Sequence, residues 1–534
     1  MGHFPWLTVV TFAPLAGGIV TVLLPSRAVR WWALVATLAT LALAFGMLGA
    51  FDGGRAGFQL VDRATWVGPV HFEYVLGVDG ISVFLVLLTA FLMPLAVLAS
   101  WKVERSPKLY LASFLVLETA TIGCFLALDL LLFFLFFEGL LFPMYLIIGG
   151  WGGGRRVYAA VKFFLFTMAG SAFLLLAILF LYFRAGSQLG TPTFELTRLS
   201  GLPLPAATAR WLFLAFFVAF AVKVPLVPIH TWLPDAYTEA PPAGSMVLAA
   251  LLAKVGAYGL IRFNLSLFPE ASSFFRTFAM TLAVVAIVYG AAVAVMQTDV
   301  KRLIAYSSLS HLGFIVLGIF AFTVPAASGS VLYMVNHGLS TGALFLLVGM
   351  LAERVGTNDL RRMGGLAARV PVLAGVFLFM ALASVGLPGL NNFVSEFLVL
   401  LGTFAASKPF AVVAVTALVL SAVYLLWAYQ RAFHGVPAIA GAADDVSGNG
   451  HAPARAEDEA ASPLKDLSAR ERLILAPLIA AVLVLGLFPR PLLTRIDPTT
   501  ARTVACLRSR TVPPLSGGGA GWTGYAPLSA GICP

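Results

Sequence analysis

KVPLVPIHTWLPDAYTEAPPAGSMVLAALLAK, residues 223–254, is the most informative part of this chain. It begins with Lys223 and ends with Lys254, and both lysines adjoin long hydrophobic runs. An ionised side chain at the centre of a bilayer costs roughly 2.5–3.5 kcal/mol on insertion scales, so such residues usually face a hydrated path or a charged partner. We therefore expect the functional groups to lie around these two lysines.

The composition of the whole chain is that of a membrane protein. Of its 534 residues, 60% are hydrophobic and 11% are charged, whereas about 25% of the residues in soluble domains are charged. The first hydrophobic span is predicted to be retained, because no Lys or Arg precedes it as in a signal peptide. We predict an all-α polytopic fold with 14 apolar spans long enough to cross a bilayer: 5–24, 31–50, 80–101, 109–128, 130–149, 158–183, 210–230, 243–264, 274–296, 302–322, 328–351, 370–406 with a break, 409–433 and 471–489.

The net charge of +10 does not indicate nucleic-acid binding, because the basic residues lie mostly in short loops, where they set membrane topology. Opposite loops near Asp129 and Pro325 carry no Lys or Arg, although the 184–210 loop is an exception. An even number of spans then places both termini outside the cytoplasm. The loops predicted to share the cytoplasmic side contain Arg27, Arg30, Lys102, Arg105, Lys108, Arg155, Arg156, Lys301, Arg302, Arg354, Arg361, Arg362 and Arg369.

The three cysteines form no CxxC pair, which excludes a cysteine-ligated iron–sulfur cluster and argues against a zinc site. We predict that this chain does no redox chemistry by itself. Cys506 and Cys533 share the final tail, which the topology places in an oxidising compartment. The sequence leaves two equal alternatives for these cysteines, a Cys506–Cys533 disulfide or two free thiols.

Residues 1–490 are predicted to form one transmembrane domain, and 52–79, 434–469 and 491–534 to lie outside the membrane. The 434–469 segment is acidic and poor in hydrophobic residues, so we predict a disordered cytoplasmic loop. The tail 491–534 is basic and rich in Gly, Pro and Ser, and we predict that it lies outside the cytoplasm and becomes ordered only on a neighbouring protein. None of these segments can house a soluble catalytic domain.

Prolines interrupt two of the predicted spans. Pro225 and Pro228 fall in the seventh, and Pro388 falls in the twelfth. Proline removes a backbone donor and clashes with the preceding turn, and lipid cannot satisfy the backbone groups that are freed. Interrupted helices in matching positions of two halves indicate a transport site. Lys223 stands just before the first break and Glu396 just beyond the second.

An internal duplication is consistent with these breaks. Glu138 and His311 are 173 positions apart, and so are Lys223 and Glu396. Because only these two pairs share the spacing, a chance match is the alternative to a duplication. The predicted repeats are two inverted five-helix units, spans 4–8 at about 109–264 and spans 9–13 at about 274–433.

Two carboxylates lie in apolar runs. Glu138 is the only charge in LLFFLFFEGLLFPMY, and Glu118 lies in LASFLVLETATIG on the preceding span. A carboxylate there requires a proton or a nearby cation, and a moving neighbour can switch it between these states. We predict that both take part in proton transfer. The alternative is a structural role, which for Glu138 is a permanent ion pair with Lys223.

Lysine and histidine provide the other candidate proton carriers. An amine can give up its proton in a poorly hydrated site and a guanidinium cannot, so Lys223 and Lys254 suit a proton relay. His311 and His337 lie on adjacent predicted spans, and histidine exchanges protons near neutral pH. The alternatives are a structural counter-ion for Lys223, snorkelling to a headgroup for Lys254, and hydrogen-bonded core histidines.

Other polar residues have simpler interpretations. Tyr145, Tyr258 and Tyr424 can join a hydrated path but are more often packing or interfacial residues. Asp79 in GVDGIS is predicted to cap the third span. Two histidines without a nearby Cys or carboxylate do not make a metal site.

Together these features resemble the antiporter-like proton-pumping subunits of respiratory complex I, NADH:quinone oxidoreductase, and the M type, equivalent to mitochondrial subunit 4, most of all. TEAPPAGS, a glutamate rather than a lysine in the second broken helix, and the absence of a long lateral helix favour the M type. The resemblance covers about residues 75–490 and rests on Glu138, Lys223, PIHTWLPDAYTEAPPAGS, Lys254, His311, His337 and Glu396.

The resemblance implies a role for each of these residues. The chain would belong to a proton-translocating enzyme without binding a cofactor, and FMN, iron–sulfur clusters and quinone are expected in partner subunits. L-type and N-type antiporter-like neighbours and lipid are expected partners, in the cell inner membrane. The implied roles are Glu138 and Lys223 as a switchable pair, Lys254 as the central relay, His311 and His337 as links onward, Glu396 as the exit group and Glu118 as a further glutamate of the fourth span.

Three rival functions share parts of this pattern. A cation/proton antiporter subunit of the Mrp type has the same fold and lysines, but it usually carries Lys where this chain has Glu396. A membrane-bound hydrogenase component has a similar architecture. A structural scaffold leaves the intramembrane ionisable groups without a reason.

Overall fold

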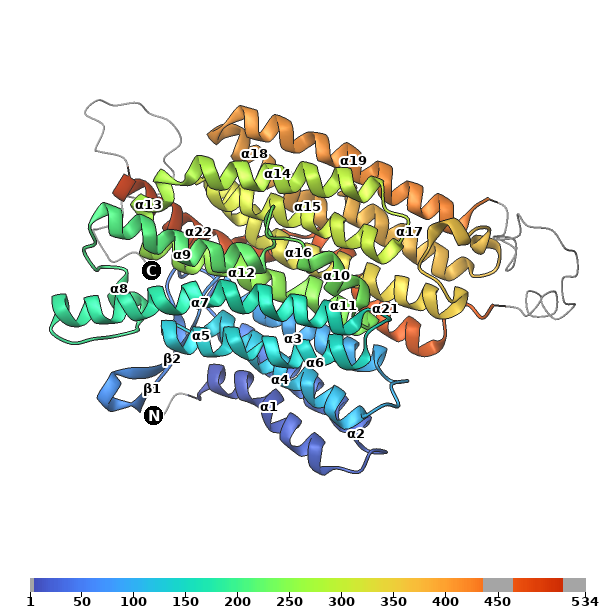
Figure 1. The fold of residues 1–534 in the computed structure, drawn as a ribbon, viewed down its shortest axis with the longest axis horizontal. Coiled ribbons are helices and arrows are strands. Elements are labelled where there is room, and N and C mark those ends of the chain that lie inside the picture. The colour runs from blue at the N-terminus through green and yellow to red at the C-terminus, as the bar shows by residue number, and fades with distance from the viewer. Residues whose placement is uncertain (1–3, 436–463, 512–534) are drawn as a thin grey trace, which may run out of the picture.

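The computed structural model describes residues 4–435 and 464–511, which form a bundle of long helices lying side by side (Figure 1). Twelve helices in this part of the chain are long and apolar enough to cross a membrane. They are α1 (Trp6–Leu23), α2 (Val29–Ala50), α3 (Ser82–Ala99), α4 (Pro107–Leu126), α5 with α6 (Leu130–Gly139 and Leu141–Trp151), α7 (Arg156–Leu189), α9 (Ala206–Lys223), the segment from α11 to η3 (Pro242–Leu265), α14 (Arg276–Val295), α15 (Val300–Phe320), α16 (Val324–Val355) and α19 (Lys408–Phe433).

The two remaining predicted spans are bent or interrupted. α21 (Ala469–Leu487) meets α22 (Arg490–Thr511) at an angle of 67°, and the two together can count as one further span. The twelfth predicted span consists of two shorter apolar helices, α17 (Pro371–Val385) and α18 (Asn391–Ala406). The all-α polytopic fold is therefore confirmed, while the count of 14 and the inverted repeats stay predictions.

Both interruptions predicted from the prolines are present. α9 ends at Lys223, and residues 224–231 lead to the short helix α10 (Trp232–Glu239) before the next span begins. Between α17 and α18, Gly386 and Gly389 adopt positive φ angles of 82° and 91°, which glycine tolerates because it has no Cβ. Lys223 thus ends one helix, and Glu396 lies in the second turn of another.

The segment Pro242–Leu265, α15 and α16 occupy the centre of the bundle. This segment consists of α11 (Pro242–Val247), the π-helix η2 (Leu248–Leu252), α12 (Ala253–Gly259) and the π-helix η3 (Leu260–Leu265). Its hydrophobic window and that of α16 are wholly buried. By contrast, α2, α7 and α19 expose large apolar side chains such as Trp31, Phe183 and Val419. Ionisable groups at the centre are therefore enclosed by protein.

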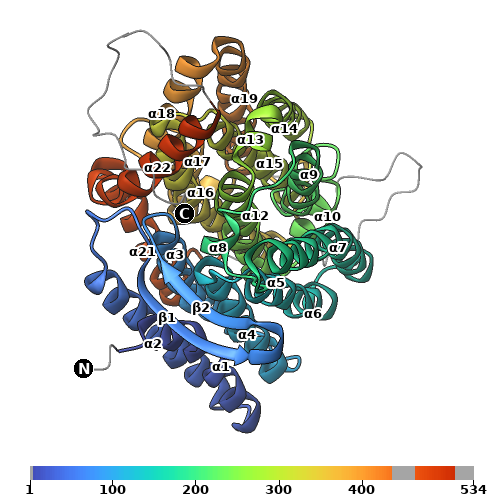
Figure 2. The same ribbon diagram turned by 90° about the vertical axis from the view of Figure 1, so that its left-hand side faces the viewer.

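The two ends of the bundle differ. At one, the hairpin end, β1 (Gln59–Val67) pairs antiparallel with β2 (Phe72–Val78), joined by η1 (Gly68–Val70), and α8 (Leu196–Leu199), α13 (Pro269–Phe274) and α22 lie nearby (Figures 1 and 2). At the other, the loop end, lie the short 3₁₀ turns η4 (Leu360–Arg362) and η5 (Leu366–Ala368). There Lys102 pairs with Glu353 at 2.9 Å, and Arg30 donates to the Val103 carbonyl at 3.0 Å. The basic loops predicted to share one side do share the loop end.

The C-terminal segment differs from its prediction. The sequence predicts a tail that becomes ordered only on a neighbour, but residues 490–511 form α22, which packs on this chain itself. Ile496, Val504 and Leu507 are buried, so α22 covers its apolar side with the rest of the bundle. The Gly, Pro and Ser residues that suggested disorder are concentrated beyond residue 511.

Two further predictions concern residues outside the described ranges. The disulfide would join Cys506 to Cys533, and Cys533 lies outside them, as do residues 436–463 of the acidic loop. Cys124 is a buried free thiol in α4.

An ion pair fixes the hairpin to α8. Arg63 donates to Glu195 at 2.6 Å and to Glu73 at 2.9 Å, and Thr197 also donates to Glu195. Burial favours the protonated form of Glu195, but the bonds from Arg63 and Thr197 prevail and lower its pKa. The Glu195 carboxylate is therefore ionised at neutral pH, and the bond is lost only as the pH falls through this lowered pKa, below the usual range of a glutamate.

We expect Arg63→Ala to speed amide hydrogen exchange in β1 at neutral pH, because the hairpin loses its anchor to α8. The wild type should show the same speed only in acid, once the pH has fallen through the lowered pKa of Glu195, after correction for the intrinsic pH dependence of exchange. Exchange measured by mass spectrometry checks this. A hairpin whose exchange is unaffected by either change would contradict the anchoring role.

Candidate functional site

Lys254 lies at the centre of the bundle between two π-helical turns. Its side chain is fully buried, and its Nζ donates to the Ala249 carbonyl at 2.5 Å and lies 2.6 Å from His337 Nδ1. The widened turn η2 brings a carbonyl five residues earlier within reach of Lys254 Nζ. π-Turns inside helices occur frequently at functional sites. Snorkelling to a headgroup is excluded, because the side chain ends on partners inside the protein.

A row of polar side chains continues from His337. The rings of His337 and His311 are 5.5 Å apart, and His311 Nδ1 lies 2.5 Å from the Tyr333 hydroxyl. Tyr333 donates to Glu396 Oε1 at 2.5 Å, and His311 Nδ1 is 3.7 Å from the same oxygen. A tyrosine hydroxyl has one proton, so His311 donates to Tyr333 while Tyr333 donates to Glu396. We call Lys254, His337, His311, Tyr333 and Glu396 the relay row.

The relay row retains capacity for proton exchange. The Nε2 atoms of His311 and His337 are both buried, and neither has a hydrogen-bond partner among the residues that the structure describes. Each imidazole can thus bind a proton on one nitrogen while it releases one from the other.

Sequence reasoning missed Tyr333, although it supplies the only described hydroxyl that bonds Glu396. The signal was present in YMVNH, because Tyr333 precedes His337 by four residues and both therefore lie on the same side of α16. Tyrosine in a membrane helix is so often a packing residue that this spacing alone did not single it out.

Lys223 and Glu138 lie near each other but are separated in this structure. Lys223 is 1% exposed, and its Nζ has no hydrogen-bond partner in the described part of the chain; it lies 4.8 Å from the ring centre of Phe137. Glu138, near the end of α5, has a buried Oε1 without a described partner. The structure therefore does not contain a closed ion pair between Glu138 and Lys223.

Gly256 brings the two lysines to adjoining helices. It lies two residues after Lys254, and a Cβ built on it would lie only 2.8 Å from Lys223 Cβ and 2.9 Å from the Phe220 carbonyl. α12 therefore touches the end of α9 at the position of Lys223. Lys223 and Lys254 therefore lie on adjoining helices, and the contact itself is made by Gly256.

Glu118 lies apart from the relay row. It is fully buried on α4, and neither carboxylate oxygen has a hydrogen-bond partner within residues 4–435 and 464–511. The structure thus confirms that this carboxylate is enclosed, but it does not bring Glu118 into contact with the other candidates.

A second buried polar cluster was missed altogether. Arg262, on η3, donates to Asp79 Oδ2 at 2.6 Å and to the Tyr258 hydroxyl at 3.0 Å. Asp79 also accepts from the backbone N–H groups of Ile81 and Ser82, so its side chain bonds the start of α3 as predicted, although Ile81 and not Asp79 is the residue directly before the helix. In the sequence, Arg262 lies inside the predicted hydrophobic span 243–264 and has no candidate partner nearby.

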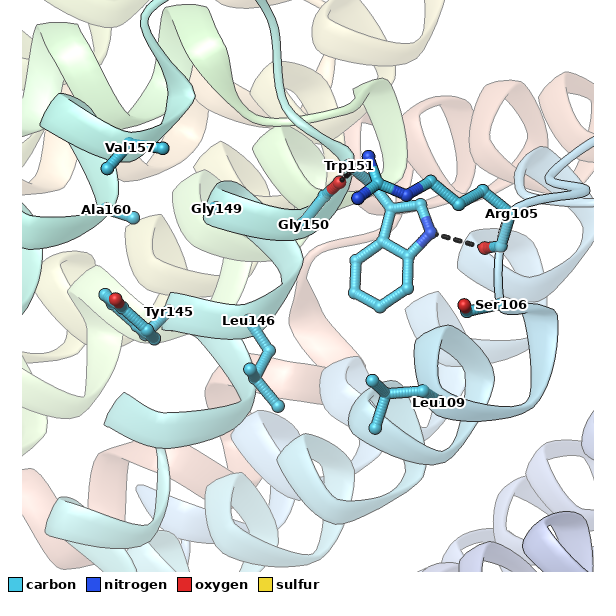
Figure 3. A pocket seen from close by; sticks show the side chains of 10 residues that line it. All are labelled: Arg105, Ser106, Leu109, Tyr145, Leu146, Gly149, Gly150, Trp151, Val157 and Ala160. Atoms are coloured by element: carbon cyan, nitrogen blue, oxygen red, sulfur yellow. Dashed lines mark hydrogen bonds between the residues drawn. The ribbon is translucent and has the colours of Figure 1, made fainter.

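The remaining tyrosines have separate surroundings. Tyr424 bonds Ser307 at 2.8 Å, whereas Tyr145 lines a surface pocket of about 230 Å³ between α4, α6 and α7 at the loop end (Figure 3). In that pocket Trp151 Nε1 donates to the Arg105 carbonyl at 2.7 Å. The pocket is lined by none of the relay-row residues. Within the described ranges, no group of three or more His, Cys, Asp or Glu side chains could hold a metal ion.

Family comparisons match this chain over most of its length. The transmembrane model of NADH:quinone oxidoreductase/Mrp antiporters matches residues 127–421, and the amino-terminal model of NADH-ubiquinone oxidoreductase chain 4 matches residues 13–135. NADH-quinone oxidoreductase subunit M of Rhodobacter capsulatus is 43% identical over 512 residues, which cover 93% of this chain and 96% of that protein. NADH-ubiquinone oxidoreductase chain 4 of Arabidopsis thaliana is 39% identical over 496 residues, 92% of this chain and 95% of that protein.

Solved structures share the fold. A chain of respiratory complex I from Thermus thermophilus with bound NADH matches with a TM-score of 0.82 and 34% identity, over 94% of this chain and 99% of that one. A chain of the Mrp complex from a Dietzia species matches with a TM-score of 0.80 and 21% identity, over 94% of this chain and 98% of that one. At 21% identity, the second match shows the fold alone.

Proposed function

This chain belongs to the antiporter-like M subunits of NADH:quinone oxidoreductase, and from that membership we propose that its relay row carries protons across the membrane while partner subunits reduce quinone. The observation that carries the proposal is the row itself. Five buried groups follow one another from Lys254 to Glu396, and each of them can take up or pass on a proton.

We infer the following surroundings for the chain. It is a multi-pass subunit of a multi-subunit membrane complex, with L-type and N-type antiporter-like subunits and lipid against its exposed apolar helices. FMN, iron–sulfur clusters and quinone belong to partner subunits. The basic loop end faces the cytoplasm by the positive-inside rule, which puts the hairpin end and both termini outside the cytoplasm of a cell inner membrane.

The proposed mechanism is electrostatic. Quinone reduction elsewhere in the complex changes the charge at one end of the membrane arm, and this biases Glu138 and Lys223 between paired and separated states. When the pair opens, Lys223 passes a proton toward Lys254, and when it closes, the proton moves along the relay row to Glu396. Moving one charge across 100 mV costs about 2.3 kcal/mol. A pKa shift of one to two units, at about 1.4 kcal/mol per unit, is large enough to supply this free energy.

An Mrp-type cation/proton antiporter is the rival function. Relatives at about 40% identity include M subunits and chain 4 of NADH oxidoreductases, whereas the Mrp chain shares only the fold. Glu396 also favours the M type over the Mrp type. Genes for NADH- and quinone-binding subunits next to the gene of this chain would separate the two.

Tyr333→Phe tests the relay row directly. It removes one hydroxyl, so we expect NADH-driven proton pumping by the assembled complex to fall about tenfold, as for the loss of one hydrogen bond to a charged group. Acidification of proteoliposomes, measured per NADH oxidised, checks this. Tyr424→Phe removes an equally buried hydroxyl that bonds Ser307 and is the control. Wild-type pumping in Tyr333→Phe would contradict the row.

A further inference from the structure

The buried ion pair between Arg262 and Asp79 lies between the relay row and the hairpin end. The two side chains are only 3% and 2% exposed. Arg262 follows Lys254 by eight residues along Pro242–Leu265, which corresponds to about 12 Å of helix. Each partner of an ion pair enclosed in this way depends on the other, because removing one leaves an uncompensated buried charge. The mechanism above gives this pair no role.

Tyr258 lies between the relay row and the ion pair. It is four residues from Lys254 and four from Arg262, so the three residues follow one side of the segment. The Tyr258 hydroxyl accepts from Arg262 Nε and donates to the Phe125 carbonyl at 2.9 Å. Its one proton is thus given to a carbonyl, and the Lys254 ammonium points away from it, toward Ala249.

Three other segments hold the pair in place. Asp79 is fixed by the first backbone N–H groups of α3, and the ring of Phe58 lies 4.7 Å from the Arg262 guanidinium. α22 crosses over the turn that carries Asp79, where the hydroxyl of Thr499 accepts from the Gly80 N–H at 3.2 Å. The Arg495 carbonyl lies so close to Gly80 that no side chain fits there. The hairpin end is therefore closed over the pair.

We propose that the Arg262–Asp79 pair is the barrier that stops protons of Lys254 from reaching the hairpin end directly and so directs them to His337. A guanidinium does not release its proton, so Arg262 interrupts any proton-transfer chain at this point. Asp79 compensates its charge and keeps it beside Tyr258. Both act as positioning residues for the relay. This inference rests on the proposed function, since a barrier has a role only where protons pass Lys254.

Passive proton entry measures the barrier. The complex carrying Asp79→Asn, Arg262→Gln or Arg262→Lys is reconstituted into vesicles with an internal pH dye, and a potassium diffusion potential is applied without NADH. We expect proton entry to rise about tenfold in all three variants, a factor equal to 1.4 kcal/mol. Arg262→Lys is decisive, because it keeps a cation opposite Asp79 and a structural ion pair would survive, whereas a lysine can release its proton.

Two further variants define the outcome. Glu471→Gln breaks the Arg354–Glu471 pair, which is 12% and 7% exposed at the loop end, and should leave proton entry at the wild-type rate. Adding Lys254→Ala to Asp79→Asn should remove the extra entry. Wild-type entry in Arg262→Lys and Asp79→Asn would overturn the barrier, and so would entry that persists without Lys254. Either result leaves the proposed function standing, because NADH-driven pumping in Tyr333→Phe tests that separately.

Discussion

Lys254→Ala is expected to reduce proton pumping by the assembled complex by roughly 10²-fold, the usual contribution of a positioned proton donor or acceptor. The Lys254 ammonium lies 2.6 Å from His337, and alanine leaves nothing in its place within hydrogen-bond distance. The proton then has no group to occupy between Lys223 and the histidines. NADH-driven acidification of proteoliposomes, together with native gels that verify assembly, measures the effect.

Lys254→Arg separates charge from proton exchange. It keeps a cation at the same position, but a guanidinium does not give up its proton, so we expect it to be as inactive as Lys254→Ala. The matched control is Lys301→Arg. Lys301 is also a buried lysine, 7% exposed, but it bonds the Thr238 and Ala240 carbonyls outside the relay row. Pumping by Lys254→Arg at the wild-type rate would show that only the charge matters.

Lys223→Ala is expected to suppress both pumping and coupled NADH oxidation in membranes by more than about tenfold while the complex still assembles. The variant removes the amine that, in the proposed mechanism, pairs with Glu138 and passes a proton toward Lys254. Assembly should persist, because Lys223 Nζ has no described hydrogen bond to lose. NADH oxidation with and without an uncoupler checks this, and full activity in assembled complex would count against the mechanism.

A double-mutant cycle then tests the switch. If Glu138 and Lys223 act as one unit, Glu138→Gln combined with Lys223→Ala should cost little more than either change alone. Additive losses would mean that the two residues act independently, as they would if they never came together from the separated arrangement seen here.

The fold was largely predictable because lipid imposes strict rules on sequence. Long apolar runs marked almost every membrane helix, and prolines marked both interruptions, since their effect on the backbone is local. The bend between α21 and α22 was not predictable in this way, because α22 depends on contacts with distant parts of the chain. Its buried Ile496 and Leu507 lie among basic residues that, in one dimension, suggested only an exposed tail.

The site was predictable where charge stood out against hydrophobic neighbours. Lys254, His337, His311 and Glu396 were recognisable for that reason, and the structure brings all four together. Tyr333 was missed because a tyrosine is unremarkable in a membrane helix until its partners are known. Arg262 was missed because its partner is 183 positions earlier, and a separation of that kind cannot be read without the fold.

The path of α22 over the turn at Asp79 also has a consequence for biosynthesis. Among the described residues, 490–511 are the last to leave the ribosome, so the twelve unbent membrane helices of the described ranges are synthesised before this cover. The nascent chain therefore already contains Lys254, His337, His311, Tyr333 and Glu396 before α22 covers the hairpin end. The hairpin end is thus covered only after those helices have been made, and a copy that ends before residue 490 lacks the cover.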